Sequence, residues 1–186
     1  KGFMINLFQD CDWENVIVKN TDGTGFGMDC PINSSVKNCI AIGCGKAATT
    51  SSAVASGFGI GTGYANNESI HIIDCTATGN KKFGFFFEHQ GRFGDNTKYP
   101  ASKSEGFVVS NCNASGNEYY DLGGNRANDV TYENCTGGSI QFENNSRRIH
   151  VVNFKKTTQF SDVPNDAWYY NAVNWAANKG IALGDG

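Results

Sequence analysis

Three carboxylates, Asp29, Glu88 and Asp121, are the side chains best suited to acid–base chemistry in this sequence. Each falls at an outward position of a recurring strand, and Asp29 and Glu88 share one column two repeats apart. At about 4.8 Å per repeat, their backbones would lie about 9.6 Å apart. This is close to the separation of the acid and the base in an inverting glycosidase. Solvated carboxylates on a strand surface are the alternative interpretation, because outward strand positions are polar by default.

The segment 88–95 has the highest density of titratable and aromatic groups. His89 is the candidate base for removing the proton α to a uronate carboxylate. Arg92, Lys98 or a bound calcium ion would then stabilise the developing enolate. The alternative is a polar surface loop.

Metal-binding patterns are weak. Asp10, Asp12 and Asp29 are candidate calcium ligands, but no loop has the spacing of a calcium site. The seven cysteines include no zinc-ligand spacing. No metal site is therefore assigned, and calcium is kept only as a possible cofactor.

A repeat positions these residues. Its marker is an asparagine or aspartate after a short alternating apolar strand, which indicates one buried face. The marker column consists of Asn20, Asn38, Asp74, Asn111, Asn134 and Asn153. A second strand with two apolar positions follows in each repeat. The shortest intervals are 18, 19 and 23 residues, which is too short for a strand–helix–strand unit and suits one coil of a β-helix.

We therefore predict an all-β fold, a right-handed parallel β-helix of five to six coils over residues 1–154. The marker column should form an interior ladder of side-chain amides, with Asp74 as its weakest member, because a carboxylate lacks a donor. The cysteines that follow the column either stack as small buried residues or form disulfides. We favour the stack, since parallel in-register neighbours rarely satisfy disulfide geometry.

Two repeats carry insertions, at 44–56 and 89–103. The first precedes the second strand of its coil and the other follows it, so we expect them on opposite sides of one sheet. Such insertions commonly line the binding face of a solenoid. Glycines at outward positions between them, such as Gly27, Gly59 and Gly61, would leave an open floor.

This repeat resembles the right-handed parallel β-helix proteins that act on polysaccharides: pectate and alginate lyases, polygalacturonases, alginate epimerases and phage tailspikes. The resemblance covers residues 2–154 and implies a polysaccharide substrate or ligand. No catalytic motif of these families is reproduced, so a lyase and a glycoside hydrolase both stay open.

Non-catalytic functions stay open as well. A carbohydrate-binding adhesin would lay Phe86, Phe93 and Tyr99 against sugar rings, with Lys98 as a further contact. A plain structural stalk is another alternative.

The pattern changes after Phe154. Residues 155–159 resemble a linker, and residues 160–186 predict a helix with Tyr169, Ala172, Val173 and Ala176 on one face. The run F-x-D-V-P-x-x-x-W-x-x-x-A-V-x-x-A-x-x-x-G-I-x-x-G resembles the first half of an S-layer homology module. The resemblance implies a secreted protein held at the cell wall or S-layer through a wall polysaccharide. The family's later motif is expected beyond Gly186.

Charge and hydropathy exclude other partners. With 15 Lys+Arg against 18 Asp+Glu, the chain lacks the basic character of a nucleic-acid-binding protein. No apolar stretch is long enough to cross a bilayer, so we expect no membrane insertion. The chain begins within a strand-like run, which suggests a piece of a longer solenoid.

Overall fold

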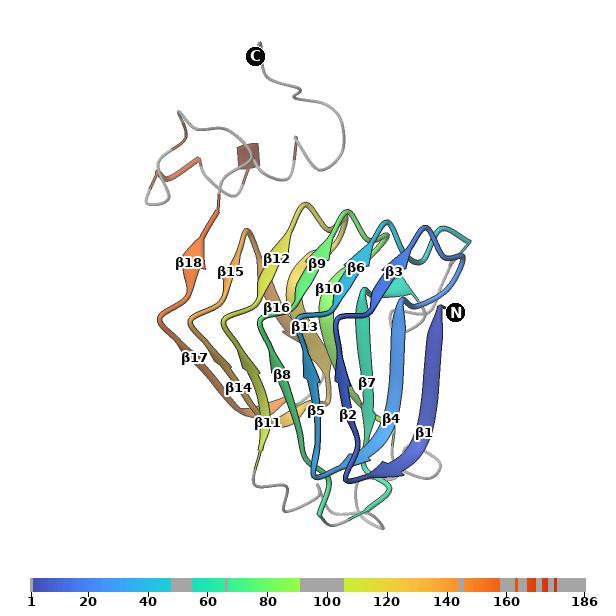
Figure 1. The fold of residues 1–186 in the computed structure, drawn as a ribbon. Helices are drawn as coiled ribbons and strands as arrows, with labels where there is room; N and C mark the ends of the chain where they lie inside the picture. The colour runs from blue at the N-terminus through green and yellow to red at the C-terminus, as the bar shows by residue number, and fades with distance from the viewer. Residues whose placement is uncertain are drawn as a thin grey trace.

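A computed structural model describes residues 2–47, 55–65, 67–90, 106–143 and 146–157, and also residues 163, 167–169, 172–173 and 176. The described solenoid contains three six-stranded parallel sheets, and each turn of the chain adds one strand to each sheet (Figure 1). This arrangement confirms the predicted all-β parallel β-helix, with six coils.

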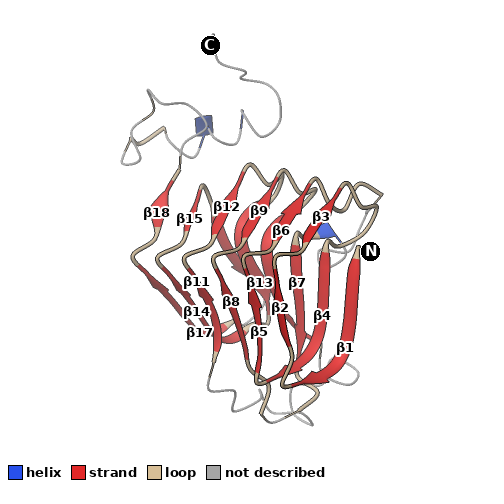
Figure 2. Cartoon of the chain, viewed as in Figure 1, coloured by secondary structure: helices blue, strands red, loops and turns tan. Residues whose placement is uncertain are grey.

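Each sheet contains every third strand of the chain (Figure 2). Sheet A consists of β1 (Phe3–Gln9), β4 (Phe26–Ile32), β7 (Phe58–Thr62), β10 (Phe83–His89), β13 (Tyr120–Asn125) and β16 (Ile140–Glu143). Sheet B consists of β2 (Asp12–Glu14), β5 (Ser34–Lys37), β8 (Ile70–Ile73), β11 (Phe107–Ser110), β14 (Asn128–Glu133) and β17 (Arg147–Val152). Sheet C consists of β3 (Ile17–Lys19), β6 (Ile40–Ile42), β9 (Thr76–Thr78), β12 (Asn113–Ser115), β15 (Thr136–Gly137) and β18 (Lys155–Lys156).

The core is built from equivalent side chains of successive coils. Phe26 and Phe58 stack with ring centroids 4.6 Å apart, and Phe58 and Phe85 stack at 4.8 Å. Each such aromatic pair adds about 0.5–1.5 kcal/mol beyond the burial of its area. These stacks therefore fix the register of sheet A from β4 to β10.

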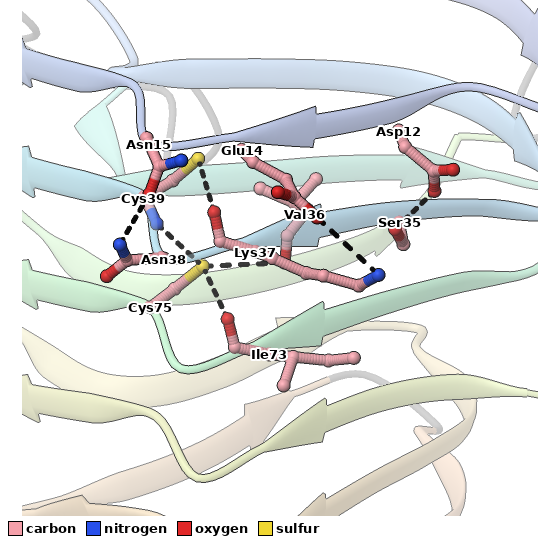
Figure 3. Close-up of polar contacts among 10 residues, drawn as sticks. All are labelled: Asp12, Glu14, Asn15, Ser35, Val36, Lys37, Asn38, Cys39, Ile73 and Cys75. Carbon is pink, nitrogen blue, oxygen red and sulfur yellow. Dashed lines mark hydrogen bonds and ion pairs between the residues drawn. The ribbon is translucent and has the colours of Figure 1, made fainter.

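The marker column differs from the sequence prediction at its first position. Asn15, and not Asn20, pairs with Asn38, whose Nδ2 donates to Asn15 Oδ1 at 2.5 Å (Figure 3). Asn20 lies at the next corner, with its Oδ1 beside Gly43. Each coil has three strands where the sequence predicted two. An asparagine at either of two corners therefore fitted the same pattern.

The marker column is also external. Asn38, Asp74, Asn111 and Asn134 are exposed corner residues with φ of 48–54°. Asparagine and aspartate tolerate this left-handed conformation better than other residues with a side chain. Asparagine and aspartate therefore recur in the column because the corner backbone requires a positive φ. The prediction of an interior ladder at these positions is wrong.

An interior ladder exists at the corner between sheets C and A. Asn80 Oδ1 accepts from Cys44 N at 3.0 Å, and Asn80 Nδ2 donates to Asn117 Oδ1 at 2.8 Å. Asn117 Nδ2 donates in turn to Asp121 Oδ1 at 2.7 Å. Gly138 N donates to the other Asp121 oxygen at 2.6 Å, so Asp121 ends the ladder. All three polar side chains are buried.

The cysteine stack is confirmed. Cys39 N donates to Cys75 Sγ at 3.4 Å, and Cys75 N donates to Cys112 Sγ at 3.3 Å. Each thiol donates to a carbonyl two residues earlier, as Figure 3 shows for Cys39 and Cys75. All seven cysteines lie in the described part of the chain, and none of them forms a disulfide.

The C-terminal segment contains helical residues at the expected positions. Ala172, Val173 and Ala176 are helical, and Val173 N donates to Tyr169 O at 3.0 Å, an i to i−4 bond. Within the described residues, no helix is long and apolar enough to cross a membrane.

Candidate functional site

The outer face of sheet A carries a hollow of about 80 Å³, which we call the sheet A groove. Its lining includes Gly27, Gly59, Gly61, Asp29, Phe86 and Glu88. The glycines lie at outward positions of β4 and β7, where the sequence predicted an open floor. The enclosed volume holds only a few water molecules, so a larger ligand would lie along the groove and not within it.

Asp29 and Glu88 lie in one row of the groove. Asp29 pairs with Gly61, and Gly61 pairs with Glu88, so the two acidic residues are two strands apart. This places their backbones about 9.6 Å apart, as the sequence predicted. A Cβ at Gly61 would collide with Asp29 Oδ1 and would approach Gln90 Nε2 to 2.5 Å. Only glycine leaves the Asp29 carboxylate free to lean over β7.

Neutral donors orient the Asp29 carboxylate. Gln90 Nε2 donates to Asp29 Oδ1 at 3.3 Å. The side-chain amide of Asn6, oriented with its nitrogen toward Asp29, donates to Asp29 Oδ2 at 3.2 Å. Tyr64 Oη donates to Gln90 Oε1 at 3.3 Å. Tyr64 is 43% exposed, so it presents an open aromatic face connected to Asp29 through Gln90.

Burial raises the pKa of Glu88, and the nearby Asp29 carboxylate raises it further. Arg126 and a hydrogen bond with Asn125 act in the opposite direction. The raised pKa keeps a larger fraction of Glu88 protonated at a given pH than for a free glutamate. Glu88 is therefore the carboxyl of the pair better suited to donate a proton.

Asp121 does not occupy the outward position on the coil beyond Glu88 that the sequence predicted. Glu88 pairs with Asn125, and Asp121 lies four residues earlier on β13. Asp121 is 3% exposed, and its carboxylate points into the interior ladder. Burial raises its pKa, while hydrogen bonds from Asn117, Gly138 and Ser139 oppose that shift. Asp121 is thus placed for a structural role.

His89 faces the interior. Its side chain is 2% exposed, and neither ring nitrogen has a hydrogen-bond partner. The ring packs on Gly63, where an added Cβ would lie 2.6 Å from Nε2. Burial, with a smaller contribution from Arg126, lowers the His89 pKa. His89 therefore does not present a base to the groove.

The predicted sugar contacts are described in part. Phe86 lines the groove, but it is only 1% exposed and packs on Phe83 with centroids 4.4 Å apart. Phe86 is therefore part of the floor and offers no open ring face. The candidates Arg92, Phe93, Lys98 and Tyr99 lie outside the described residues, as does most of each insertion.

The candidate calcium ligands are not brought together. Asp10 and Asp12 line a hollow on sheet B, whereas Asp29 lies on sheet A. Among the described residues, no group of three or more His, Cys, Asp and Glu side chains has the arrangement of a metal site.

Sequence reasoning missed Asn125, Arg126, Gln90 and Tyr64. The first two would have been found with the correct register of β13. Tyr64 belongs to a loop whose conformation is held by Glu68. The buried Glu68 carboxylate accepts hydrogen bonds from the amides of residues 63, 64 and 65 at 2.7, 2.8 and 3.0 Å. No sequence signal indicated that this loop would reach Asp29.

Comparison with known proteins identifies the C-terminal segment. Residues 159–186 match the S-layer homology domain, in agreement with the resemblance in the sequence. No curated protein and no solved structure matches the chain. The S-layer homology domain associates the protein with the cell surface, at the cell wall or S-layer.

Proposed function

We propose that this cell-surface protein hydrolyses glycosidic bonds of a polysaccharide that lies along the sheet A groove. The observation that supports this proposal most directly is the pair of carboxyl residues Asp29 and Glu88, which lie in register on either side of Gly61. The β-helix fold is compatible with a carbohydrate-related role, and the S-layer homology domain supports a wall-polysaccharide partner for anchoring.

Each carboxyl has a distinct role in this proposal. Glu88, whose pKa is raised by burial, protonates the glycosidic oxygen as the bond breaks. Asp29, oriented by Gln90 and Asn6, accepts a proton from a water that attacks the anomeric carbon from the opposite side. A backbone separation of about 9.6 Å leaves room for that water between the carboxyl groups.

Hydrolysis is favoured over β-elimination by the position of His89. Elimination requires a base at the carbon α to a uronate carboxylate and a cation for the enolate. Arg126 supplies a positive charge near Glu88, but the His89 ring is buried on the other side of the sheet. Among the residues that the structure describes, the two carboxylates needed for hydrolysis both line the groove, whereas the predicted base for elimination does not.

Carbohydrate binding without cleavage is the second candidate. The exposed ring of Tyr64 favours it, since an aromatic face next to hydrogen-bonding groups binds sugars by stacking alone. Tyr64 fills the role that the sequence assigned to Phe86. It would serve equally as a substrate platform in the hydrolase.

A screen of the full chain on neutral and acidic polysaccharides separates these functions. New reducing ends without absorbance in the unsaturated-uronate band support the hydrolase. A rise in that absorbance would identify a lyase and contradict the proposal. Retention on a polysaccharide with neither signal would establish the binding function in its place.

A further inference from the structure

A second hollow lies on the outer face of sheet B, at its corner with sheet A, and we call it the sheet B hollow. It encloses about 430 Å³, which falls in the range of roughly 300–1,000 Å³ typical of ligand sites. Except for Ile73, its lining is polar. An apolar ligand would leave these polar groups without partners, so the lining favours a ligand rich in hydroxyl groups.

The polar groups of the sheet B hollow are already ordered. Asn33 Nδ2 donates to Asp10 Oδ1 at 2.7 Å, and Asn33 N donates to Ser69 Oγ at 2.9 Å. Ser35 Oγ donates to Asp12 Oδ1 (Figure 3). These bonds hold the acceptors in place before any ligand arrives, which reduces the entropy lost on binding.

Other groups in the hollow still have hydrogen-bonding capacity. Asp12, Ser35 and His71 form one row across β2, β5 and β8. Among the described residues, the His71 imidazole makes no hydrogen bond, and the Asp12 carboxylate has a partner on only one oxygen. Lys37 Nζ is 3.7 Å from Glu14 Oε1, and both side chains are well exposed, so this pair is easily separated. The row therefore offers acceptors and donors side by side.

We propose that the sheet B hollow is a second polysaccharide-binding site, selective for neutral glycans. Sugar hydroxyls both donate and accept, which matches the free Asp12 oxygen, the His71 imidazole and the Lys37 ammonium. Ile73 adds an apolar contact for a ring face. Asp10 and Asp12 face one lysine and one histidine, so the site has no excess of positive charge and disfavours a polyuronate.

This site is distinct from the sheet A groove. Residues 30–32, at the end of β4, separate Asp29 of the groove from Asn33 of the hollow. Binding at the hollow does not require cleavage at the groove, and it would hold a polymer at the protein while the groove is empty. The inference therefore stands or falls independently of the proposed hydrolysis.

Affinity electrophoresis of the full chain tests the site, with soluble mixed-linkage β-glucan and polygalacturonate as the two gel additives. We compare the wild type, His71→Ala and a matched control, His150→Ala. His150 occupies the same outward row of sheet B three strands away, through Val108 and Thr131. Both histidines are exposed, so neither change should affect folding.

The site predicts that β-glucan retards the wild type and that polygalacturonate does so less. His71→Ala should weaken retardation by β-glucan about three- to tenfold, the equivalent of one net hydrogen bond. His150→Ala should behave as wild type. Equal retardation of the two alanine variants, stronger retardation by polygalacturonate, or no retardation of the wild type would each overturn the proposal.

Discussion

Replacing Asn117 with alanine tests whether the buried ladder, and not the exposed marker column, stabilises the solenoid. The Asn117 side chain accepts two hydrogen bonds from Asn80, at 3.1 and 2.8 Å. It donates to Ala77 O at 3.0 Å and to Asp121 Oδ1 at 2.7 Å. All of these groups are buried, and alanine removes all four bonds, although Asn80 Nδ2 keeps Ala41 O and Asp121 Oδ1 keeps the backbone amide of residue 117.

The magnitude follows from those four bonds. At about 1 kcal/mol of net stability for each bond, Asn117→Ala should lower the free energy of unfolding by about 4 kcal/mol. Asn111 lies in the same coil but is exposed, and its side chain makes no hydrogen bond among the described residues. Asn111→Ala loses only the preference of asparagine for a φ of 54°, worth about 1–2 kcal/mol at most.

The assay is guanidinium unfolding of both variants and the wild type, followed by circular dichroism, with the slope m checked for equality. We expect the midpoint of Asn117→Ala to fall well below that of Asn111→Ala. If Asn111→Ala loses as much stability as Asn117→Ala, the ladder is not the stabilising element and the argument from buried hydrogen bonds fails.

Three further predictions concern the thiols, the groove and the anchor. In the native protein, at most one thiol, that of the half-buried Cys11, should react with an aromatic disulfide reagent, because the other six are buried and burial raises the pKa of Cys30 to about 12. All seven thiols should react after denaturation. Fewer than seven reactive thiols in the unfolded chain would reveal disulfides. Because the folded protein raises the pKa of Glu88, its contribution favours folding below the ordinary carboxyl pKa and is lost as pH rises through the raised value. The melting temperature of Glu88→Gln relative to wild type should therefore increase between about pH 3.5 and about pH 7, and a constant difference would contradict the shift. A protein that carries its S-layer homology region intact should sediment with purified wall fragments, whereas a variant truncated after Gln159 should stay in the supernatant. Sedimentation of the truncated variant would assign anchoring to the solenoid.

The fold was predictable because its signal is repeated. Alternating apolar residues recur in every coil, and four of the six coils have a phenylalanine at the position of Phe26, Phe58 and Phe85, so one ambiguous coil does not change the fold. The corners were less predictable. Asn15 and Asn20 fit the same pattern, since a left-handed corner residue follows both β2 and β3.

The site was predictable only where the register was. Asp29 and Glu88 were placed correctly because Phe26, Phe58 and Phe85 align their strands. On β13 the apolar alternation favoured the frame of Tyr120 and Leu122, because the alternative frame of Leu122 and Gly124 has only one apolar side chain. The structure chooses the second frame, which buries Asp121 and brings Asn125 beside Glu88. Burial of His89 depends on packing against Gly63, a contact that strand alternation does not encode.

A comparison of the kcat values of Glu88→Gln and Glu143→Gln is the most direct test of the proposed function. Glu143 lies in the same outward row, two strands beyond Glu88 through Asn125, so it is a matched carboxylate outside the pair. With a polysaccharide that the wild type cleaves, Glu88→Gln should lower kcat by about two orders of magnitude or more, as expected for loss of a general acid, and Glu143→Gln should retain nearly full activity. Full activity in Glu88→Gln, or an equal loss in both variants, would contradict the assignment of catalysis to the Asp29 and Glu88 pair.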